Sequence, residues 1–124
     1  MHIALKITLG LPALLFAFVG LGWVTDPGGT APTFGMPLLE GAGLSTQVGD
    51  LGAFFITLSA TLLLGIFTQR KPWFYAAAML LLLTAAFRTV AWGLHGASFE
   101  VQSIAIEIIV GALALVAASK ASSH

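Results

Sequence analysis

The chain has 124 residues, no net formal charge, no cysteine, and 8% charged residues against 58% hydrophobic ones. A soluble domain carries about 25% charged residues, so this composition excludes a water-exposed globular fold and indicates a single integral membrane domain over residues 1–124. The missing cysteine excludes disulfides, iron–sulfur clusters and thiol catalysis. The neutral charge and the lack of a basic tract argue against a nucleic-acid partner.

Four stretches are long and apolar enough to cross a bilayer, which takes about 20 predominantly apolar residues. They cover residues 3–24, 45–68, 72–95 and 99–119. Short turns join the last three, so we predict an all-α fold in which four transmembrane helices form an antiparallel bundle. Residues 25–44 form the one long connection, which is rich in glycine and proline and is expected to fold over the outer end of the bundle.

The basic residues predict the direction in which the chain crosses the membrane, because Lys and Arg are enriched in cytoplasmic loops. They lie near the N-terminus, between the second and third spans, and after the fourth span: Lys6, Arg70, Lys71 and Lys120. With four spans these places share one side, so both termini are expected in the cytoplasm. Tryptophans near the span ends are expected to anchor the helices at the membrane interface: Trp23, Trp73 and Trp92.

Polar side chains follow one face of each of the last three spans. Arg88 lies seven residues before His95, or ~10 Å deeper in the membrane at about 1.5 Å per residue. Asp50 and Glu107 reach similar depths on the neighbouring spans. Charged groups inside a membrane face the bundle interior and pair with one another, so we predict an Asp50–Arg88–Glu107 network in the outer half of the bundle. Three further residues complete this candidate cluster: Gln47, His95 and Ser103.

The predicted network does not balance its charges, since two carboxylates and one guanidinium leave one negative charge and arginine keeps its proton. Either an acid is protonated, with the deeper Glu107 favoured, or His95 is protonated, or a cationic group binds. The cluster is either a structural lock between helices or the floor of a ligand pocket. His95 alternatively caps its helix before Gly96. No metal site is predicted, because Arg88 repels cations.

Four segments carry a resemblance to a known family: STQVGDLGAFF, AAFRTVAWGLHG, IEIIVGALAL and FGMPLL. Over nearly the whole chain they resemble the small four-helix bacterial membrane proteins grouped as DoxX-like, and within that group a subgroup described only as a domain of unknown function. The resemblance implies a multi-pass protein of the bacterial inner membrane. It also implies that the family's characteristic polar positions are Asp50, Arg88, His95 and Glu107. It implies no established activity, although some broader relatives are named as subunits of quinone-linked oxidoreductases.

Three functions remain open. The small size, the short loops and the lack of nucleophile-elbow, P-loop and dinucleotide motifs favour a non-catalytic accessory or interaction subunit, in a larger membrane complex or a homo-oligomer. The second is a binder of a lipophilic small molecule, such as a quinone, a lipid or a carotenoid, with no cofactor required. The third is a membrane isomerase or quinone-linked oxidoreductase that uses Glu107 or Asp50 for proton transfer. Membrane lipids are expected partners in each case.

Overall fold

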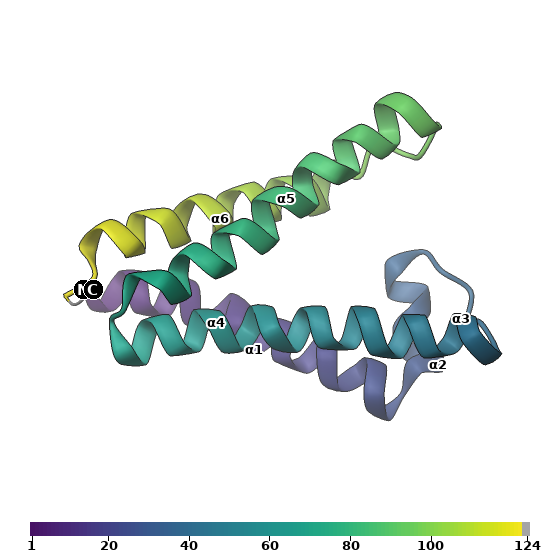
Figure 1. The fold of residues 1–124 in the computed structure, drawn as a ribbon, viewed down its shortest axis with the longest axis horizontal. Helices are drawn as coiled ribbons and strands as arrows, with labels where there is room; N and C mark the ends of the chain where they lie inside the picture. The colour runs from purple at the N-terminus through teal and green to yellow at the C-terminus, as the bar shows by residue number, and fades with distance from the viewer. Residues whose placement is uncertain (123–124) are drawn as a thin grey trace. The chain divides into compact units, whose positions relative to one another are not determined.

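The computed structural model describes residues 1–122, which are almost entirely helical and form no β-strand (Figure 1). Among these residues, four helices are long and apolar enough to cross a membrane: Ile3–Thr25, Gly41–Thr68, Lys71–His95 and Val101–Lys120. The first is α1, the third is α5 and the fourth is α6. The all-helical class and the four candidate spans predicted from the sequence are therefore confirmed.

The second candidate span consists of three consecutive segments: α3 (Gly41–Thr46), the π-helical η2 (Gln47–Leu51) and α4 (Gly52–Thr68). It begins four residues before the predicted start at residue 45. Gly41 and Gly43 resemble loop residues in the sequence, because glycine disfavours a helix by about 1 kcal/mol relative to alanine. Between α1 and α3 the chain forms two further short helices, α2 (Pro27–Thr30) and the 3₁₀ segment η1 (Ala31–Phe34).

The chain divides into two compact units. Unit 1 comprises Met1–Gly10 and the residues from Thr61 onward, and so contains the start of α1, the end of α4, and both α5 and α6. Unit 2 comprises Leu11–Ala60. Unit 1 holds all five Lys and Arg residues and two of the acids, whereas unit 2 holds three acids and no Lys, Arg or His. The two units therefore carry opposite formal charge.

In unit 1, α5 and α6 pack along each other as an antiparallel hairpin (Figure 1). Their buried positions are mostly alanine or glycine, including Ala85, Gly111 and Ala114. Small residues let two helix backbones approach closely inside a membrane, where no hydrophobic driving force favours association. Gly96, with φ of 72°, ends α5, and its N–H donates to the carbonyl of Ala91. A left-handed glycine thus stops the helix directly after His95.

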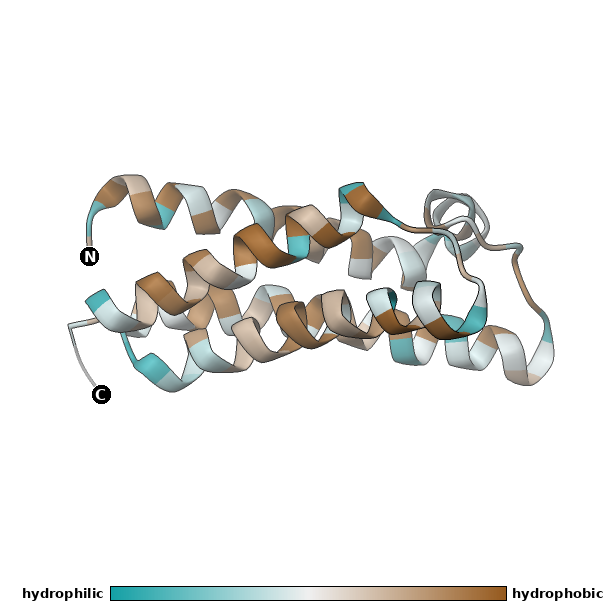
Figure 2. Ribbon diagram, turned by 90° about the horizontal axis from the view of Figure 1, so that it is seen from above, coloured by the Kyte–Doolittle hydropathy of each residue, from teal (hydrophilic) through white to brown (hydrophobic). Residues whose placement is uncertain are grey.

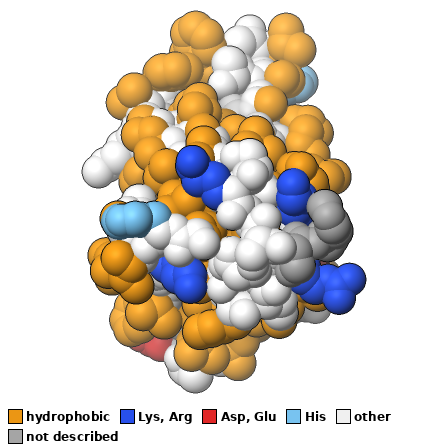
Figure 3. Space-filling model, turned by 90° about the vertical axis from the view of Figure 1, so that its left-hand side faces the viewer, with side chains coloured by type: hydrophobic (Ala, Val, Ile, Leu, Met, Phe, Trp, Pro, Cys, Tyr) orange, Lys and Arg blue, Asp and Glu red, His pale blue; other side chains and the backbone are white. Residues whose placement is uncertain are grey.

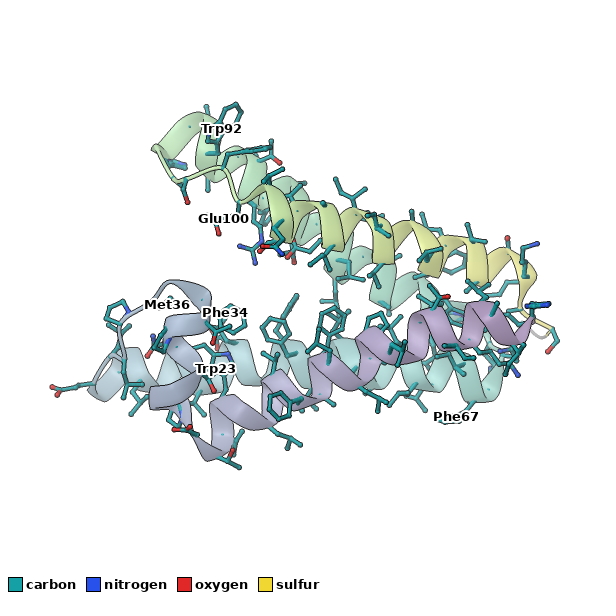
Figure 4. All side chains as sticks on the ribbon, turned by 180° about the vertical axis from the view of Figure 1, so that it is seen from behind. Trp23, Phe34, Met36, Phe67, Trp92 and Glu100 are labelled. Carbon is teal, nitrogen blue, oxygen red and sulfur yellow. The ribbon has the colours of Figure 1, made fainter. Side chains whose placement is uncertain are left out.

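An aromatic cluster organises unit 2 (Figure 4). Trp23 is 0% exposed, and its ring centroid lies 5.7 Å from that of Phe34. Phe34 in turn contacts Phe55 of α4 at 5.3 Å. These contacts attach the connection after α1 to the first half of α4. The prediction that Trp23 is an interfacial anchor was wrong, because its side chain is fully buried. The sequence shows that Trp23 lies at a span end, but it does not show that the ring of Phe34 packs against it.

The residues along most of each long helix are hydrophobic, and hydrophilic residues concentrate near the helix ends (Figure 2). Large apolar side chains are exposed, among them Phe67 at 79%. Such a surface is typical of helices that face lipid. Lysine and arginine gather at the end of unit 1 where α1 begins, α4 passes to α5, and α6 ends (Figure 3). These residues are Lys6, Arg70, Lys71 and Lys120.

Candidate functional site

An ion pair within the apolar helices joins α5 to α6. The Nε of Arg88 donates to both carboxylate oxygens of Glu107, at 3.1 Å from Oε1 and 3.0 Å from Oε2. The side chain of Arg88 is 33% exposed and that of Glu107 is 12% exposed. The predicted contact between the third and fourth spans is confirmed. A charged donor and a charged acceptor make such a hydrogen bond stronger than a neutral one.

The antiparallel hairpin places Arg88 and Glu107 at about the same distance from the turn between α5 and α6. Arg88 lies seven residues before the end of α5 at His95, and Glu107 lies six residues after the start of α6 at Val101. At about 1.5 Å per residue, these positions are ~10 Å and ~9 Å from the shared turn. The pairing thus follows from helix length and direction.

Glu107 occupies only one donor of the guanidinium. Arginine carries five N–H donors, and the four on Nη1 and Nη2 have no hydrogen-bond partner among the residues of unit 1 that the structure describes, up to residue 122. The neighbouring hydroxyls of Thr84 and Thr89 donate to the carbonyls of Leu80 at 2.6 Å and Ala85 at 2.9 Å, and neither accepts a hydrogen bond from Arg88. Arg88 therefore offers donors to an acceptor from outside unit 1.

Ser103 and His95 lie on the same two helices but outside the hydrogen-bonded pair. Ser103 is half-buried on α6, four residues before Glu107, and so lies on the same face of that helix. His95 is the exposed last residue of α5. Its position fits the alternative prediction that His95 closes its helix directly before Gly96.

Gln47 lies in unit 2 and fixes the segment that precedes its helix. Its side chain is 2% exposed. Its Oε1 accepts the N–H of Leu39 at 2.9 Å, and its Nε2 donates to the carbonyl of Pro37 at 2.9 Å. Extended main chain outside secondary structure must find other hydrogen-bond partners, and Gln47 supplies two. Sequence reasoning placed Gln47 in the polar cluster and missed this role.

Asp50 lies in the π-helical segment η2 and is exposed. Within unit 2 its carboxylate makes no hydrogen bond or ion pair. It lines a pocket of about 450 Å³ together with Gln47 and five other residues: Met36, Leu39, Gly43, Thr46 and Leu51. Single π-helical turns inside longer helices occur frequently at functional sites.

The predicted cluster thus falls into two parts. Unit 1 contains Arg88, Glu107, Ser103 and His95, and unit 2 contains Gln47 and Asp50. The proposed pairing of Asp50 with Arg88 stays a prediction. Among residues 1–122, no group of three or more His, Asp or Glu side chains is placed to hold a metal ion.

Comparison of the chain with protein-family models, with curated proteins and with solved structures found no match. The DoxX-like resemblance therefore stays a prediction. Function has to be argued from the site, because a fold alone does not specify an activity.

Replacing Gln47 by alanine is expected to release the segment 36–40 from the helix. The variant leaves the main-chain groups of Leu39 and Pro37 without their partners, which costs about 1–3 kcal/mol. Hydrogen exchange and limited proteolysis of the detergent-solubilised protein should show faster exchange and cleavage in this segment. The control is Gln102→Ala, at an exposed position of α6. Equal protection of the segment in both variants would contradict the anchoring role.

Proposed function

We propose that the chain is a small, non-catalytic, multi-pass membrane protein that acts as an accessory or interaction subunit of a larger membrane complex. The observation that supports this proposal is the guanidinium of Arg88, which lies within an apolar helix and has four donors without a partner in the described part of unit 1. Inside the membrane no water reaches these Nη donors, and each unsatisfied polar group there costs several kcal/mol. A carboxylate or carbonyl of a partner chain removes that cost.

The surroundings of Arg88 support an interaction role. The adjacent Phe87 is 70% exposed, and Leu94, one residue before the end of α5, is 76% exposed. An exposed apolar surface with one embedded charge suits association inside a membrane, because a polar group in hydrocarbon favours contact with a matching group on a neighbouring helix. The charge of Arg88 would then select the partner, and the apolar side chains would supply the contact area.

The arrangement of the four helices and their orientation in the membrane are part of the same proposal. We infer a DoxX-like antiparallel four-helix bundle in the bacterial inner membrane, with the Gly/Pro-rich connection at its outer end. The basic residues at one end of unit 1 support cytoplasmic termini.

The absence of cysteine allows this orientation to be tested with single cysteine substitutions. A membrane-impermeant thiol reagent added to intact cells should label Ala97→Cys, in the turn between α5 and α6, because that turn is expected outside. The same reagent should label Ser122→Cys only after the membrane is opened. The reverse pattern would contradict the proposed orientation.

Extraction in a mild detergent tests the accessory role. The tagged wild-type chain should recover a larger partner in a fixed ratio, and Arg88→Gln should recover about tenfold less. A hydrogen bond to a charged group contributes about 1.5–3 kcal/mol, and 1.4 kcal/mol corresponds to about tenfold in binding. The control is Arg70→Gln, which removes an exposed arginine in unit 1. Recovery of the wild-type chain alone, or unchanged recovery with Arg88→Gln, would count against the proposal.

A second candidate function is the binding of a lipophilic small molecule such as a quinone or a lipid. Two-thirds of the Arg88 side chain is already covered, which suits a small carbonyl or phosphate head group better than a large protein surface. Native mass spectrometry of the same preparations separates the two functions. A bound small molecule that is lost in Arg88→Leu, without a protein partner in the wild type, would favour this candidate.

A further inference from the structure

The pocket beside the π-helical segment η2 has no part in the proposed accessory role, and its chemistry differs from that of Arg88. Its volume of about 450 Å³ lies within the ~300–1,000 Å³ of typical ligand pockets. All of its lining residues belong to unit 2. Met36, Leu39 and Leu51 provide apolar wall, and Thr46, Gln47 and Asp50 provide polar groups.

One wall of this pocket is fixed before any ligand arrives. Gln47 holds the main chain of Pro37 and Leu39 through its two hydrogen bonds of 2.9 Å. Leu39 is itself a lining residue, so Gln47 ties this wall to the helix that carries Asp50. A preformed wall lowers the ordering cost of binding.

Asp50 is the one charged residue that lines the pocket. An ionised carboxylate only accepts hydrogen bonds, and within unit 2 this one has no donor side chain bound to it. Unit 2 contains no Lys, Arg or His that would neutralise it. Within unit 2 the pocket thus combines a carboxylate that no cation balances with apolar walls, which matches a ligand that has a cationic head and an apolar body.

We propose that this pocket binds the primary ammonium head group of an aminophospholipid of the phosphatidylethanolamine type. Asp50 accepts the ammonium N–H groups, with the hydroxyl oxygen of Thr46 as a second acceptor. The apolar part of the lipid lies against Met36, Leu39 and Leu51. The proposal depends neither on Arg88 nor on a partner subunit.

The lining also distinguishes a primary from a quaternary ammonium. Proteins recognise choline-like groups with aromatic side chains, and none of the seven lining residues is aromatic. A quaternary ammonium has no N–H to donate to Asp50. Successive methylation of the amine should therefore weaken binding step by step, whereas the phosphate and the acyl chains stay the same.

The test measures lipid binding by native mass spectrometry of the full chain. The probes are phosphatidylethanolamine, its N-methyl and N,N-dimethyl derivatives, and phosphatidylcholine, all with identical acyl chains. The wild type should bind phosphatidylethanolamine about tenfold more tightly than phosphatidylcholine, as expected for the loss of a charge-assisted hydrogen bond. Asp50→Asn should remove most of this preference. Glu40→Gln, which neutralises another exposed acid of unit 2 outside the pocket, should keep it.

A measurement on the wild type alone guards against misfolded variants. Propylammonium should displace phosphatidylethanolamine, and tetramethylammonium at the same concentration should not. Equal binding of the two lipids by the wild type, or an unchanged preference in Asp50→Asn, would overturn the proposal. Free ethanolamine that binds as tightly as the lipid would overturn the assignment to a lipid and point to a soluble amine.

The predicted pairing of Asp50 with Arg88 gives a different pattern. In that case Asp50→Asn and Arg88→Gln would lower stability alike, and the wild type would show no preference between the two lipids. That pattern would also overturn the proposal.

Discussion

Replacing Glu107 by leucine is expected to destabilise the chain by about 3 kcal/mol, the lower end of the range for breaking a buried ion pair. The variant leaves Arg88 in an apolar helix without the acceptor that both carboxylate oxygens supply. The lower end applies because the Arg88 side chain is one-third exposed. Unfolding from mild detergent by added sodium dodecyl sulfate, followed by circular dichroism, measures the change.

The double variant Arg88→Leu/Glu107→Leu provides the decisive comparison. Removing both charges leaves no unpaired group, and such replacements are often neutral or stabilising, so its stability should return close to that of the wild type. Glu100→Leu is the matched control, since Glu100 is an exposed acid at the start of α6 and outside the pair. A double variant as unstable as Glu107→Leu would show that the two residues are not coupled.

The pairing of Arg88 with Glu107 could be predicted because it depends only on composition, turn length and spacing along the chain. Composition identifies the spans, a short turn makes α5 and α6 antiparallel, and the distance of each charge from that turn gives its depth. The cost of an isolated charge in an apolar helix then favours contact. Gly96 was predictable for a similar reason, since a glycine after the last apolar turn commonly ends a helix.

Other features depend on contacts that no local pattern specifies. The burial of Trp23 follows from Phe34, which reaches it through the irregular connection after α1. The two hydrogen bonds of Gln47 depend on an extended segment that passes its helix. The π-helical turn that carries Asp50 has no sequence signature of its own. The surroundings of Asp50 were therefore the least predictable, because its pocket is formed by the π-helical turn and by the extended segment that Gln47 holds.

Gly111→Leu is expected to destabilise the α5–α6 hairpin by about 1–3 kcal/mol, the usual range for overpacking. A Cβ at Gly111 would lie 2.8 Å from Cδ2 and 2.9 Å from Cγ of Leu82, and 3.4 Å from Cβ of Leu81. The added atoms of leucine therefore displace the side chain of Leu82 or push the two helices apart. Gly111 lies one turn beyond Glu107 on α6, so the separation should also weaken the pair with Arg88.

Gly93→Leu is the matched control for this steric effect, because Gly93 is a helical glycine of α5 and a Cβ there meets nothing within 4 Å. Both substitutions remove a glycine from a helix and add the same side chain, so the unfavourable helix propensity of glycine cancels in the comparison. Gly93→Leu should match or exceed the wild type in the same unfolding assay. Equal stability of the two variants would mean that close packing at Gly111 does not hold α5 against α6.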